Sequence, residues 1–115
     1  MRSRLREAIL GAGLFASAFA LAAGPQGVTI SMQQAAFVPA DTTVAPGTHV
    51  TWTNTDTVPH SVTAADNRFD SGPILPGNSF EWTAEDNGEV NYHCIFHPSM
   101  TAKLTVGATA SEARK

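Results

Sequence analysis

The most constraining feature of this 115-residue chain is a series of short β-rich runs separated by turn residues. Pro, Gly, Asn and Asp gather between the runs, and no segment keeps a 3.6-residue apolar period for three turns. The runs predict strands at 28–33, 42–45, 49–54, 60–64, 79–83, 89–94 and 101–106. Many short strands with regular turn signals are typical of an all-β antiparallel sandwich or barrel.

Period-two alternation predicts which side chains of these strands face the core. Cys94 is in phase with the apolar Val90 and Tyr92, so it should point inward at the end of its strand. His60 begins another strand in phase with Val62 and Ala64. Met100 precedes the last strand in phase with the inward set Ala102, Leu104 and Val106. We therefore expect His60, Cys94 and Met100 to meet at one pole, with the 95–99 loop over them.

The other two histidines outside that loop do not fit this arrangement. His93 is adjacent to Cys94 and so has the opposite phase, while His49 belongs to a different strand. We expect both to be surface histidines.

The run from Cys94 to Met100 contains three residue types that bind metal ions. Its Cys-x-x-His-x-x-Met spacing places Cys94, His97 and Met100 on one tight loop, and His60 arrives from a separate strand. Thiolate and thioether sulfur suit Cu(I), imidazole suits both copper states, and a trigonal His-His-Cys plane with a weak axial Met is a compromise geometry. Zinc is the alternative metal, but methionine is a poor zinc ligand.

Cys94 is the only cysteine of the chain, so no internal disulfide can form. A free thiol is a liability in an oxidising compartment, and metal ligation would protect it. An intermolecular disulfide or a merely buried thiol is the alternative.

The segment 50–106 resembles the cupredoxins, the small blue-copper proteins, and most of all their amicyanin and plastocyanin branch. The matching elements are residues 50–54, 58–60 and 88–94, followed by His97-Pro98 and Met100. The two-residue gap between His97 and Met100 is similar to the short loop of amicyanin. The resemblance implies an eight-stranded Greek-key sandwich holding one type 1 copper ion. It also implies His60, Cys94 and His97 as equatorial ligands and Met100 as the axial ligand.

Two residues depart from the family pattern next to these ligands. Ser61 stands where the family often has an asparagine that ties the two ligand loops together. Phe96 stands where amicyanin has a proline, so it keeps a backbone N–H that could donate to the Cys94 sulfur and raise the reduction potential.

The first 22 residues predict a secretory signal peptide. A positive head with Arg2, Arg4 and Arg6 precedes an apolar run from Ala8 to Ala23 that ends in small residues. The alternative is an uncleaved signal-anchor helix. We expect a signal peptide at 1–22, one domain at 23–107 and a short flexible tail at 108–115, in a periplasmic or otherwise exported protein.

Removing residues 1–22 leaves 7 − 3 = 4 basic and 10 − 1 = 9 acidic residues, a formal charge of −5. A mildly acidic surface argues against nucleic acid and anionic membranes as partners, since both need clustered Lys and Arg. We also expect no membrane insertion of the mature form. We expect a monomer whose partners are redox proteins docking transiently near His97. An apolar collar of Pro59, Phe96 and Pro98, with Leu75 or Pro73, would surround that ring.

The sequence favours an electron carrier without substrate turnover. A protein for copper delivery or sequestration is the main alternative, since it could use the same ligands. Copper enzymes with such domains need further domains and interdomain histidines, and a metal-free binding module would leave Cys94, His97 and Met100 unexplained.

Overall fold

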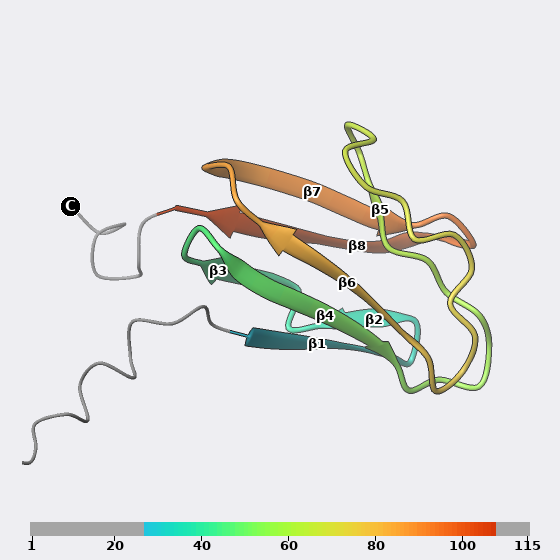
Figure 1. The fold of residues 1–115 in the computed structure, drawn as a ribbon. Helices are drawn as coiled ribbons and strands as arrows, with labels where there is room; N and C mark the ends of the chain where they lie inside the picture. Colours follow the sequence, from blue (N-terminus) through green and yellow to red (C-terminus); the bar gives the residue numbers. More distant parts are fainter. Residues whose placement is uncertain (1–26, 108–115) are drawn as a thin grey trace, which may run out of the picture.

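The computed structural model describes residues 27–107 as two stacked four-stranded sheets (Figure 1). The predicted signal peptide and C-terminal tail lie outside these residues. Within the described residues, no helix is long and apolar enough to cross a membrane. One sheet has the order β2 (Ala36–Val38), β1 (Gly27–Gln33), β4 (Thr48–Asn54), β6 (Ser79–Ala84). The other has the order β3 (Asp41–Val44), β8 (His97–Val106), β7 (Gly88–Cys94), β5 (Thr63–Ala64).

The predicted all-β, eight-stranded sandwich is therefore confirmed, with some differences in its strands. Strand β2 was not predicted, because three residues ending before Pro39 are too few to show an alternation. The strand expected at 60–64 is reduced to Thr63–Ala64, with only an isolated bridge at His60. The pairs β1–β4 and β3–β8 are parallel rather than antiparallel. A parallel neighbour requires a crossover, and the chain makes one by passing through β2 and β3 between β1 and β4.

The core lies between the sheets and is built around Trp52. Its indole is fully buried and lies 5.4 to 5.9 Å, centroid to centroid, from the rings of Phe69, Phe80 and Tyr92. The predicted inward phases hold, because Val90, Tyr92 and Cys94 are buried along β7. Burial of such apolar side chains contributes about 1.5–3 kcal/mol each to folding.

The predicted ligands lie at one end of this sandwich. The turn that joins β7 to β8 and the long segments on either side of β5 come together there (Figure 1). The opposite end carries the β6–β7 turn at residues 85–87.

Candidate metal centre

Cys94 and His97 face each other across a tight hairpin. Strand β7 ends at Cys94 and β8 begins at His97, so only Ile95 and Phe96 form the turn, and Cys94 and His97 are register partners. Our expectation that His97 lies on a loop outside the strands was wrong, since this two-residue turn lets the pairing continue to the ligands. The hairpin thus places Cys94 and His97, which are three residues apart in the sequence, side by side.

His60 reaches the same point from the other side, on the segment before β5. Its backbone makes two hydrogen bonds with Ile74, from His60 N to Ile74 O (3.1 Å) and from Ile74 N to His60 O (2.7 Å). Its side chain is fully buried. The imidazole is therefore enclosed by the folded core.

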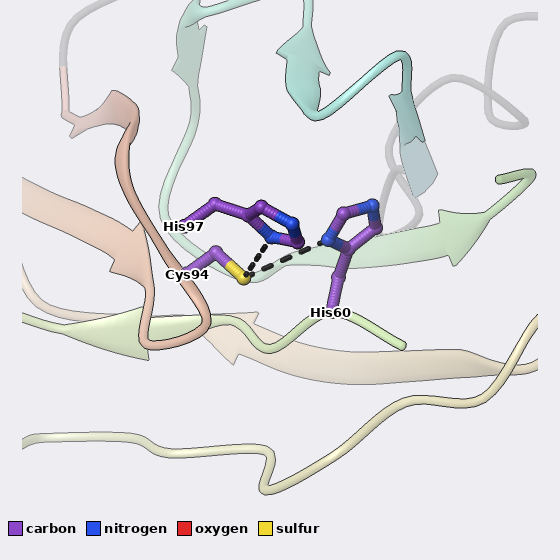
Figure 2. Close-up of side chains that lie close together, drawn as sticks. All are labelled: His60, Cys94 and His97. Atoms are coloured by element: carbon purple, nitrogen blue, oxygen red, sulfur yellow. Dashed lines mark hydrogen bonds between the residues drawn. The ribbon is translucent and has the colours of Figure 1, made fainter. Parts of the chain in front are cut away.

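The three side chains form one cluster (Figure 2). Cys94 Sγ lies 3.7 Å from His60 Nδ1 and 3.7 Å from His97 Nδ1, and the three ligand atoms lie within 4.8 Å of one another. A metal ion with bonds of about 2.0 Å to nitrogen and 2.3 Å to sulfur would separate the nitrogen and sulfur ligands by about 3.5–3.7 Å at tetrahedral to trigonal bond angles. The donor set and its spacing therefore fit a single transition-metal ion.

Met100 is buried next to this hairpin, three residues after His97 in β8. Residues 98–100 have no partner in β7, because the register passes from the pair His93–Thr101 directly to Cys94–His97. This bulge inserts extra residues of β8 beside the cluster. The methionine thus has the inward orientation that its phase predicted.

The remaining histidines stay outside the cluster, as we expected. His93 points to the outer side of its sheet, where it lines a surface hollow of about 550 Å³ together with Thr101 and Lys103. His49 is exposed on β4, with Nδ1 3.0 Å from Thr83 Oγ1. Neither has a ligand atom in the cluster.

Ser61 ties the two ligand segments together in the place of the family's asparagine. Its backbone N–H donates to Cys94 Sγ (3.3 Å), and its hydroxyl oxygen accepts the backbone N–H of Ile95 (2.9 Å). We expected Phe96 N–H to donate to the sulfur, but within residues 27–107 Phe96 makes no such hydrogen bond, and Ser61 N–H takes that role. Because the donor is a main-chain group, side-chain identity could not reveal it.

Asp56 is a site residue that the sequence analysis missed. Its Oδ2 accepts a hydrogen bond from His60 Nε2 (2.7 Å), while its side chain is only 18 % exposed. Backbone N–H donation from Ala35, together with the His60 contact, lowers the Asp56 pKa to about 2. The carboxylate is therefore ionised at neutral pH.

Comparison with known proteins agrees with this geometry. Residues 7–106 match the family described as a cupredoxin-like domain. The chain belongs to the cupredoxins. No curated protein matches the sequence. Among solved structures, the chain is similar to a purple cupredoxin from Nitrosopumilus maritimus, with 31% identity and a TM-score of 0.66 over 70% of this chain and 99% of the other.

Two further structures show the same fold at lower identity. An oxidised methionine-to-leucine variant of amicyanin has 21% identity and a TM-score of 0.65, over 69% of this chain and 80% of amicyanin. A copper-containing nitrite reductase from Thermus scotoductus SA-01 has 24% identity and a TM-score of 0.68. The match covers 75% of this cupredoxin but only 23% of the reductase chain.

Apolar side chains are exposed around the cluster. Among residues 27–107, four of the five large exposed hydrophobic residues lie within two positions of a candidate ligand or of the bridge partner of His60: Val58, Leu75, Ile95 and Phe96. Pro59 and Pro98 are exposed as well, and the His97 ring is half-buried. The collar thus includes the predicted Leu75 and Phe96, and also Ile95 and Val58, which we did not predict.

Proposed function

We propose that this cupredoxin is an exported one-electron carrier with a type 1 copper ion held by His60, Cys94, His97 and Met100. The observation that carries the proposal is the cluster of two imidazole nitrogens around the buried Cys94 sulfur. Copper bound there would supply a Cu(I)/Cu(II) couple. Thiolate, imidazole and thioether together suit both of its oxidation states.

The protein's own contribution is rigidity. Cys94 and His97 are fixed by a two-residue hairpin, His60 by two backbone hydrogen bonds, and Ser61 links the two segments. Ligands that cannot rearrange keep a similar arrangement in both oxidation states, which favours fast electron transfer. This rigidity also favours a carrier over the rival function of copper delivery or sequestration, because delivery requires ligands that exchange easily.

We propose a carrier without substrate turnover. For the location we propose the periplasm or another exported compartment, on the basis of the signal-like residues 1–22. We further propose that the mature form acts as a monomer with transient redox partners.

Adding Cu(II) to the purified protein tests the site directly. We expect an intense visible thiolate-to-copper band that saturates at one equivalent, and a reversible one-electron wave in voltammetry. A protein that stays colourless would refute the type 1 site. Rapid transfer of Cu(I) to a competing chelator, together with the absence of a reversible voltammetric wave, would support copper delivery or sequestration over electron transfer.

The docking surface can be tested by electron self-exchange between two copies of the protein. Phe96 is 46 % exposed in the turn between Cys94 and His97. If two copies dock through their collars, a Phe96→Glu substitution would place the two new carboxylates, one from each copy, opposite each other. Like charges that face each other cost several kcal/mol, so we expect the self-exchange rate to fall by about tenfold or more. NMR line broadening in mixtures of the two oxidation states measures this rate.

Thr43→Glu is the matched control, because it adds the same charge on an exposed residue whose register partner, Thr105, lies at the far end of β8. We expect little change in its self-exchange rate. Equal rates for the two variants would argue against docking through the collar.

A further inference from the structure

Asp56 connects the buried ligand His60 to the turn between β1 and β2. One carboxylate accepts three hydrogen bonds: Gln34 N–H donates to Oδ1 (2.6 Å), Ala35 N–H to Oδ2 (2.9 Å), and His60 Nε2 to Oδ2 (2.7 Å). Metal-binding histidines commonly use their second ring nitrogen in this way, which fixes the tautomer and increases ligand basicity.

The turn that holds Asp56 is strained. Gln34 and Ala35 have φ values of 53° and 55°, in the left-handed region that side chains other than Gly and Asn rarely adopt. Their conformation aims two consecutive N–H groups at the same carboxylate. Backbone strain of this kind persists where the surroundings over-determine it, and it clusters at functional sites.

A buried asparagine holds the loop that carries Asp56 in place. Asn54 is fully buried; its Oδ1 accepts the Asp56 N–H (2.9 Å), and its Nδ2 donates to Val58 O and Ile74 O, both at 2.9 Å. Both sides of the Asp56–His60 contact are therefore positioned by the fold. A surface carboxylate that met the histidine by chance would have no such support.

The hydrogen bond determines which nitrogen of His60 carries the proton. A carboxylate can only accept, so Nε2 is the protonated nitrogen. In the neutral ring the lone pair is then on Nδ1, the atom that lies 3.7 Å from Cys94 Sγ. Asp56 thereby presents His60 to the cluster in its metal-binding form, and its negative charge favours the more positive oxidation state of a bound ion.

We propose that Asp56 is a positioning residue of the metal centre: anchored by the Gln34–Ala35 turn, it locks the His60 tautomer and lowers the reduction potential of bound copper. The effect on potential rests on the function proposed above, whereas the effect on the tautomer can be measured without copper.

Asp56→Asn is the decisive variant, because it keeps an oxygen that can accept from His60 but removes the charge. We expect Cu(II) affinity to fall about 10–100-fold, as is typical when such outer-shell partners are lost. The reduction potential depends on the ratio of the Cu(II) and Cu(I) affinities. It should rise by about 59 mV for each tenfold by which the loss of Cu(II) affinity exceeds the loss of Cu(I) affinity. Asp86→Asn, in the turn at the opposite end of β7, removes the same charge and should leave the potential nearly unchanged.

The copper-free protein provides the second readout. ¹⁵N chemical shifts of the His60 ring should show protonated Nε2 in the wild type and in Asp56→Asn, and a tautomer mixture in Asp56→Ala. A wild-type ring protonated on Nδ1, or a potential in Asp56→Asn equal to that of Asp86→Asn, would overturn the proposal. If Asp56→Ala fails to fold, the wild-type tautomer and the potential of Asp56→Asn still decide. If no copper binds, the proposed function is wrong. The ¹⁵N shifts of the copper-free protein would still decide whether Asp56 fixes the His60 tautomer.

Discussion

Cys94→Ser should abolish the intense visible absorption of the copper-loaded protein entirely. That absorption requires charge transfer from a thiolate, and Cys94 is the only cysteine in the chain. Serine has nearly the same size but is a poor ligand for Cu(I), so we also expect the reversible one-electron wave to disappear. Absorption spectra and voltammetry at equal copper concentration measure both effects.

His93→Ser is the matched control for this substitution. His93 immediately precedes Cys94 in β7, but it points to the outer side of the sheet. The same serine at this position should leave the band and the wave intact. A band that survives Cys94→Ser, or one that is lost in His93→Ser, would contradict the assignment of the ligands.

The sequence predicted that His60, Cys94 and His97 come together, because these residues obey local rules. Cys94 and Met100 follow the alternation of their strands, and the spacing of Cys94 and His97 suits a hairpin with a two-residue turn. His60 was placed by the phase of its neighbours, although it forms only an isolated bridge and not a strand. Their strand phase was sufficient to orient His60, Cys94 and Met100 toward the core.

The hydrogen bonds around the ligands were harder to predict, because they join residues that are far apart in the sequence. Asp56 meets the amides of Gln34 and Ala35 across 22 and 21 residues, and Ser61 meets Ile95 across 34. No propensity predicts a left-handed Gln-Ala turn, since this dipeptide normally avoids it. The parallel pairing of β1 with β4 escaped prediction for the same reason, as it depends on a crossover rather than on either strand.

Trp52→Ala should produce the largest loss of stability among single substitutions in the core. The indole is fully buried and packs against Phe69, Phe80 and Tyr92. Removing a buried aromatic side chain and leaving a cavity costs about 3–5 kcal/mol of unfolding free energy. For a domain of this size, each kcal/mol lowers the Tm by about 4–8 °C.

The copper-free protein is the correct material for this measurement, because a ligand that binds only the folded state adds its own stabilisation. Trp82→Ala is the matched control: its indole is half-buried, with Phe69 4.7 Å away between ring centroids, so the cavity it leaves opens toward solvent. We expect a clearly smaller loss for Trp82→Ala in urea unfolding, with similar m-values for both variants. Equal losses would mean that the core is not centred on Trp52.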